Sequence, residues 1–171
     1  MTRITGKTLQ PTFTTLLFAV VALVMSGCAT NPQKSGGFGP QHSEVCVATD
    51  EREIAALFDR WNNSLRTGDV HKVVANYATK SVLLATVSNK PRLTPEEKED
   101  YFHHFLENKP SGQIDWRSIK IDCTSAVDVG LYTFTFARTG EQVKARYTFT
   151  YRWDGKQWLI TSHHSSAMPE K

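Results

Sequence analysis

Two arginines and a pair of histidines offer the clearest binding chemistry in this sequence. Arg117 and Arg146 lie in segments with strand-like alternation, and His163 and His164 lie in the last such segment. A guanidinium presents a planar fork of N–H donors that matches a carboxylate. Successive strand residues point to opposite faces, so only one of the two histidines can point inward. The pattern predicts a site for a small polar or anionic ligand, formed by Arg117, Arg146, Tyr147 and one of these histidines.

The strand that carries Arg146 leaves a second interpretation open. Between Val143 and Trp153 the odd positions are apolar, and the even positions carry Lys, Arg or Thr. Such alternation is typical of a strand with one face on the core and the other in water or in a pocket. The even face therefore either lines a pocket or is simply solvated.

Metal, cofactor and nucleic-acid binding are not expected. His103 and His104 are adjacent rather than one helical turn apart, and no metal-ligand spacing surrounds them. The net charge of +3 includes Arg3 and Lys7 near the N-terminus; without them 18 basic residues face 17 acidic ones. A chain so nearly balanced has no basic excess with which to bind nucleic acid.

The N-terminus is typical of an export signal. Arg3 and Lys7 precede an apolar run, Phe13 to Met25, which is interrupted only by two threonines and is short for a membrane span. The following residues, Met25-Ser26-Gly27-Cys28, resemble the lipobox of bacterial lipoproteins. The resemblance implies that residues 1–27 are removed and that Cys28 carries acyl chains such as palmitate, which anchor the protein to the membrane.

The boundaries of the mature protein follow from this interpretation. Residues 28–43 are rich in Gly, Ser and Pro and predict a flexible tether, and residues 44–171 suffice for one domain. Ala29 differs from the Asp that marks inner-membrane retention, so we expect an outer-membrane anchor facing the periplasm.

Two cysteines remain in the predicted domain, Cys46 and Cys123. In an oxidising compartment an even pair of cysteines tends to close, so we predict a disulfide between them. Two buried free thiols are the alternative.

Three helical segments come first in the domain. Asp50 can cap a helix that Gly68 ends, and Asp69 can cap a short one. A β-prone run from Ser81 to Val87 follows. The sequence Thr94-Pro95-Glu96-Glu97 combines a capping Thr with a Glu three residues later, which predicts a third helix reaching about Asn108.

The rest of the chain alternates with period two, as in strands. The alternation changes parity within Ile114 to Cys123, which predicts a β-bulge near Arg117 or Ser118. Further strands are expected at 127–136, 143–153 and 157–165, the last two joined by an Asp-Gly turn. The fold class is therefore α+β, with an antiparallel meander of long strands.

The end of the chain resembles a known family. Asp154-Gly155-Lys156-Gln157-Trp158 and the run from His163 to Pro169 are similar to the end of the association (hub) domain of calcium/calmodulin-dependent protein kinase II, within the NTF2-like superfamily. The similarity covers about Asp50 to Pro169. It implies a cone, with three helices packed on a strongly curved antiparallel sheet, a pocket at the wide end and an open sheet face used for dimers or larger rings. Nothing in the chain resembles a kinase domain.

The resemblance leaves three functions open. The first is a non-catalytic, membrane-tethered domain that self-associates and binds a small ligand. The second is an enzyme like the steroid isomerases and SnoaL-like cyclases of this superfamily, which set an Asp base opposite a hydroxyl donor. The third is an inhibitor or other protein-binding module of the envelope. For the enzyme, no motif selects one pair among the candidate bases Asp115, Asp122 and Asp128 and the candidate donors Tyr101, Tyr132 and Tyr147.

Overall fold

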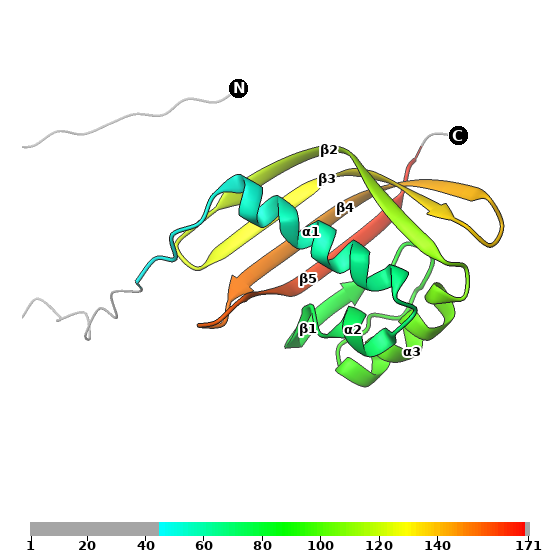
Figure 1. Cartoon of the computed structure of the whole chain (residues 1–171), viewed down its shortest axis with the longest axis horizontal. Helices are drawn as coiled ribbons and strands as arrows, with labels where there is room; N and C mark the ends of the chain where they lie inside the picture. Colours follow the sequence, from blue (N-terminus) through cyan, green and yellow to red (C-terminus); the bar gives the residue numbers. More distant parts are fainter. Residues whose placement is uncertain (1–44, 170–171) are drawn as a thin grey trace, which may run out of the picture. The chain divides into compact units, whose positions relative to one another are not determined.

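The computed structural model describes residues 45–169, so the predicted leader, Cys28 and the tether lie outside the described residues. The elements in chain order are α1 (Glu51–Arg66), α2 (Val70–Val74), β1 (Tyr77–Leu84), α3 (Pro95–Leu106), β2 (Pro110–Ile121), β3 (Ser125–Phe136), β4 (Glu141–Trp153) and β5 (Trp158–Ala167). The helices lie on one side of a curved sheet (Figure 1). This confirms the α+β fold class and the cone of three helices on a sheet. None of the described helices is long and apolar enough to cross a membrane.

Both long helices begin where their caps predict. The Asp50 carboxylate accepts the Glu53 amide at 2.8 Å. At α3 the Thr94 hydroxyl accepts the Glu97 amide at 3.2 Å, while the Glu97 carboxylate accepts the Thr94 amide at 3.3 Å. These contacts satisfy backbone donors that have no partner within the helix, which fixes the first turn.

The sheet has the strand order β1-β5-β4-β3-β2. Strands β2 to β5 are antiparallel neighbours, as expected, but β1 pairs with β5 in parallel. The predicted antiparallel sheet is therefore confirmed for β2 to β5, while the edge strand β1 runs parallel to its neighbour. The chain leaves β1 through α3 and returns as β2 at the opposite edge, so β1 meets β5 only through a long connection, which permits parallel pairing.

The predicted bulge is present but lies slightly earlier in β2. The register with β3 shifts between Ile114 and Trp116, which makes Asp115 the extra residue. The Asp115 carboxylate accepts the Thr133 hydroxyl at 2.7 Å. After the bulge Trp116 pairs with Leu131 on the outer face, and Arg117 pairs with Gly130 on the inner face.

The predicted disulfide between Cys46 and Cys123 is confirmed. It ties the segment before α1 to the turn between β2 and β3. The Val47 amide also donates to the Cys123 carbonyl at 2.9 Å.

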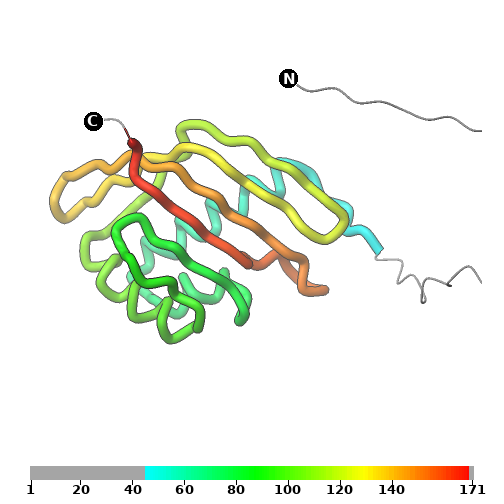
Figure 2. Tube along the Cα trace, turned by 180° about the vertical axis from the view of Figure 1, so that it is seen from behind, coloured from blue at the N-terminus to red at the C-terminus, as the bar shows by residue number. Residues whose placement is uncertain are grey.

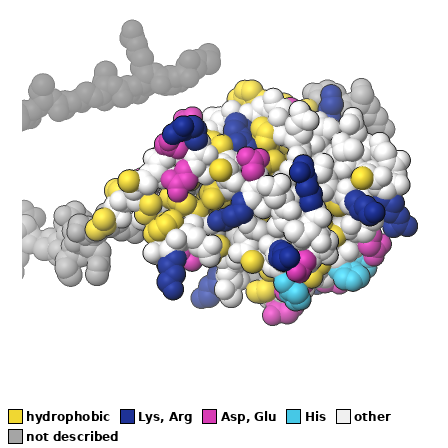
Figure 3. All heavy atoms as spheres, in the orientation of Figure 1, with side chains coloured by type: hydrophobic (Ala, Val, Ile, Leu, Met, Phe, Trp, Pro, Cys, Tyr) yellow, Lys and Arg dark blue, Asp and Glu magenta, His cyan; other side chains and the backbone are white. Residues whose placement is uncertain are grey.

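An aromatic core fills the space between the helices and the inner face of the sheet. Trp61 of α1 lies at its centre and contacts Phe102, Phe134 and Phe149 edge to face. The outer face differs, because no helix of the described chain crosses it (Figure 2). On the face that carries α1, cationic and anionic side chains are interspersed (Figure 3).

Candidate functional site

A cavity of about 90 Å³ lies at the wide end of the cone, between α3, the end of β1 and the hairpin of β3 and β4. Its wall is mostly aromatic and aliphatic. The lining residues are Trp61, Leu83, Ala85, Thr86, Val87, Tyr101, Phe102, Phe105, Tyr132, Phe134, Phe136, Val143, Ala145, His163 and Ser165. None of these described lining residues is an Asp, Glu, Lys or Arg. The cavity therefore resembles the apolar pockets with few polar groups that bind small molecules.

His163 is a deeply buried polar side chain of this wall, with 4% of its surface exposed. Its ring stacks on Phe149 with the centroids 4.0 Å apart, and Trp61 approaches it edge-on. Burial, helped by the nearby His164, lowers the pKa of His163 to about 3, so the ring is neutral at physiological pH. Its Nδ1 lies 2.9 Å from the Tyr77 hydroxyl, whereas Nε2 has no hydrogen-bond partner among the described residues.

The hydroxyl of Ser165 is a second polar group of the cavity wall, and it already has hydrogen-bond partners. The Ser165 hydroxyl accepts the Tyr132 hydroxyl at 2.6 Å and also pairs with the Thr86 hydroxyl. Burial raises the pKa of Tyr132 well above its usual value, so this phenol keeps its proton as a donor. Hydrogen bonds thus connect Tyr132 of β3, Ser165 of β5 and Thr86 of the loop after β1.

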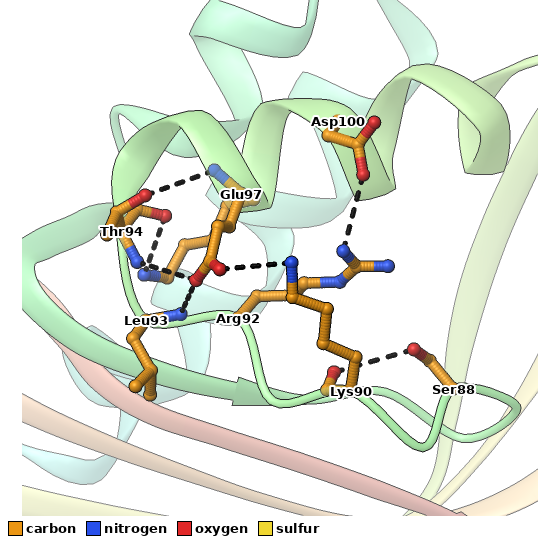
Figure 4. Close-up of polar contacts among 8 residues, drawn as sticks. Ser88, Lys90, Arg92, Leu93, Thr94, Glu97 and Asp100 are labelled. Carbon is orange, nitrogen blue, oxygen red and sulfur yellow. Dashed lines mark hydrogen bonds and ion pairs between the residues drawn. The ribbon is translucent and has the colours of Figure 1, made fainter.

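The loop that follows β1 forms the rim of the cavity and is held by α3. The Glu97 carboxylate accepts the Leu93 amide at 2.7 Å and pairs with Lys90 at 3.1 Å (Figure 4). These two contacts and the Thr94 amide lower the pKa of Glu97 to about 2. Arg92 pairs with Asp100 at 3.3 Å (Figure 4). Its guanidinium also lies over the Tyr101 ring. The rim is therefore attached to the helix by charged contacts.

A separate buried cluster lies beneath α1. Asp128 is completely buried; its Oδ1 accepts the Tyr147 hydroxyl at 2.9 Å, and its Oδ2 lies 3.5 Å from Arg117 Nη2. Burial raises the pKa of Asp128, while Tyr147 and Arg117 oppose that rise. Gly130 permits the arrangement, since a Cβ there would lie 2.0 Å from the Trp116 carbonyl and 2.9 Å from the Tyr147 hydroxyl. The cluster is a compensated charge pair.

The predicted ligand set is thus divided between different places. His163 lines the cavity, while Arg117 and Tyr147 lie in the buried cluster and pair with Asp128. Arg146 and His164 are exposed on the outer face of the sheet. The Arg146 side chain is solvated, which was the second interpretation of this strand. It does not lie near Arg117.

An isomerase- or cyclase-like enzyme would need a buried Asp base near a Tyr hydroxyl, and the structure contains one such pair among the candidates. Asp115 and Asp122 are exposed, whereas Asp128 meets Tyr147 in the interior. Neither Asp128 nor Tyr147 lines the cavity, however, and Arg117 already faces the carboxylate. The pair therefore lacks contact with the space in which a substrate would be held.

Tyr77, Thr86 and Ser165 also belong to the site, although the sequence pattern did not predict them. Ser165 had a usable signal, because it shares strand parity with His163. His103 and His104 are adjacent in the sequence and have a further acidic neighbour in the fold. On the surface of α3 their ligand atoms and those of Glu107 lie within 4.8 Å of one another. All three side chains are exposed, and we assign them no role.

Solved structures show the same fold. A Xanthomonas campestris protein described as a calcium/calmodulin dependent protein kinase II association domain is 49% identical and superposes with a TM-score of 0.69; the match covers 74% of this chain and 96% of that one. A Nostoc punctiforme protein of unknown function with a cystatin-like fold is 19% identical, with a TM-score of 0.62 over 73% of this chain and 96% of that one. A Streptomyces avermitilis protein described as a dehydratase of the NTF2-like family is 10% identical, with a TM-score of 0.63 over 70% and 96%. The last two show the fold alone.

Comparison of the sequence with family models gives a more specific result. No curated protein matches the chain. The model of the calcium/calmodulin dependent protein kinase II association domain matches residues 50–169, which span every helix and strand described above. Together with the Xanthomonas relative, this match shows that the chain belongs to the calcium/calmodulin dependent protein kinase II association domain family.

Proposed function

We propose that this protein is a lipid-anchored, non-catalytic association module of the bacterial envelope, which self-assembles through the outer face of its sheet and holds a small ligand in its cone. The observation that carries the proposal is the uncovered outer face with Trp116 on it. Trp116 is 56% exposed, although tryptophan is usually well buried. The association-domain family supports assembly as the purpose of such a face.

The composition of the outer face suits a protein interface. Trp116, Leu131 and Arg146 lie side by side in one row across β2, β3 and β4. The next row carries Val129 and Thr148. Aromatic residues and arginine are enriched in interfaces, and a rim of polar side chains commonly surrounds the apolar centre. In this interpretation Arg146 serves assembly rather than a small anion.

The membrane anchor is compatible with this proposal. With Cys28 lipidated and residues 28–43 acting as a tether, each subunit of an assembly would contribute one anchor. Several anchors on one particle bind a membrane far more persistently than one, because release requires all of them to leave together. We place the assembly at the outer membrane, facing the periplasm.

The test is the mass of the particle that the full chain forms. We expect sedimentation velocity in detergent to give a dimer or larger ring, and Trp116→Lys to shift it toward the monomer. Leu93→Lys is the matched control, because Leu93 is 54% exposed but lies in the loop before α3. A wild-type chain that stays monomeric at tens of micromolar would contradict self-assembly and favour a different protein partner on this face.

A further inference from the structure

The chemistry of the cone cavity defines the kind of ligand that it can hold. Its described wall contains no charged side chain, and His163 is neutral because the low pKa given above keeps it unprotonated. An anion or a cation in this space would lose its hydration without gaining an opposite charge, which is strongly unfavourable. The cavity is therefore matched to an uncharged molecule.

The size and lining of the cavity narrow the class of ligand further. A cavity lined by Leu, Ile and Phe that takes up benzene has a volume of about 150 Å³, and the present one, at about 90 Å³, is somewhat smaller. Rings of Trp61, Phe102 and Phe134 contribute to its wall. Aromatic walls favour a flat ring that can contact them face to face or edge to face. A single small ring is therefore the largest group that the cavity holds, and a ring with a substituent enters only if the wall moves slightly.

The hydrogen-bonding preference follows from the tautomer of His163. Among the described residues, Nδ1 of His163 is the only acceptor within hydrogen-bond distance of the Tyr77 hydroxyl, at 2.9 Å. If Nδ1 were instead the donor, both the Tyr77 hydroxyl proton and Nε2 would lack a partner among the described residues. Tyr77 therefore donates to Nδ1, and the proton of the neutral imidazole lies on Nε2. This N–H has no partner among the described residues and has almost no exposed surface, which costs free energy unless the wall moves and a ligand supplies an acceptor.

We propose that the cone cavity binds a small uncharged ring compound bearing a hydrogen-bond acceptor, such as a carbonyl oxygen, which receives the Nε2 proton of His163. The inference rests on the part of the proposed function that places a ligand in the cone, and it is independent of assembly. It also narrows the small polar or anionic ligand expected from the sequence to a neutral polar one, because Arg117 and Arg146 do not line the cavity.

The test compares three probes of similar size on the full chain, namely benzamide, benzoate and toluene. Benzamide has the acceptor without charge, benzoate has the same shape with a charge, and toluene lacks the acceptor. We expect titrations followed by NMR of ¹⁵N-labelled histidine to give benzamide at least tenfold tighter binding than benzoate. We also expect it to bind severalfold tighter than toluene and to shift the Nε2 resonance of His163.

Two variants separate the acceptor from the cavity. A leucine side chain at position 163 has no N–H donor, so His163→Leu should remove the preference for benzamide over toluene. Ala145→Leu should fill the cavity and abolish binding of all three probes. Tighter binding of benzoate, equal binding of benzamide and toluene, or no binding of any probe would each overturn the proposal. Sedimentation of the same samples reports assembly separately, so either proposal can fail alone.

Discussion

At the scale of single residues, the neutral buried histidine gives a pH dependence of a defined sign. Because the pKa of His163 is about 3 in the fold and about 6.5 in an unfolded chain, the unfolded state binds more protons between these values. The free energy of unfolding is therefore highest above pH 6.5 and falls as the pH drops toward 3, by up to about 1.4 kcal/mol per pH unit from this residue.

Urea unfolding of the full chain between pH 7 and pH 5 measures this slope, in a range above most carboxylate titrations. We expect His163→Asn to be less stable than the wild type at pH 7 but to lose stability less steeply as the pH falls. His103→Asn, at an exposed position on α3, should keep the wild-type slope. A wild-type slope retained in His163→Asn would show that His163 is not held neutral.

Strand parity explains which site residues the sequence could predict. It established that only one of His163 and His164 points inward, and the packing of Phe149 and Trp61 decides that it is His163. Parity could not show whether Arg117 and Arg146 lie on the same face of the sheet. The bulge at Asp115 shifts the alternation in β2, and this shift decides which face carries Arg117. The contact between Ser165 and Thr86 joins residues 79 positions apart, so no local pattern reveals it.

At the scale of elements, the helix starts were predictable and the sheet edge was not. Asp50 and Thr94 act through backbone amides within three residues, so their sequence context is sufficient. The run from Ser81 to Val87 correctly indicated a strand, but β1 begins at Tyr77, and its partner β5 begins at Trp158. The choice of partner depends on the path through α3 rather than on the strand itself.

The loop between β1 and α3 should depend on one carboxylate. Glu97 binds the Leu93 amide and Lys90, so Glu97→Ala should release the rim and increase hydrogen exchange at the Leu93 amide severalfold or more. The pKa of about 2 means that the contact is complete above the usual pKa of 4.5 and is lost as the pH falls through about 2. Glu96→Ala, which removes the same charge from the same turn, should leave Leu93 protected. Equal exchange in both variants would mean that the loop is held by other contacts.

At the scale of the whole molecule, the cone cavity and the disulfide lie at opposite ends of β3. The cavity is lined by Phe134 and Phe136 at the end of that strand, whereas Cys123 lies just before its start. Twelve residues of strand span roughly 40 Å, so the cross-link and the cavity do not share contacts. Stability and ligand binding should therefore respond separately to changes at the two ends.

The disulfide is the means to test that separation. It joins residues 77 positions apart, and closing a loop of that length lowers the entropy of the unfolded chain by an amount worth about 4 kcal/mol at room temperature. We expect the double variant Cys46→Ala and Cys123→Ala to lose stability of about that size in urea, and reduced wild type to behave alike. Benzamide binding at low denaturant should stay within about twofold of wild type, because the bond and the cavity lie at opposite ends of β3. Loss of binding together with stability would instead mean that the cone is shaped as one cooperative unit from the disulfide to the cavity.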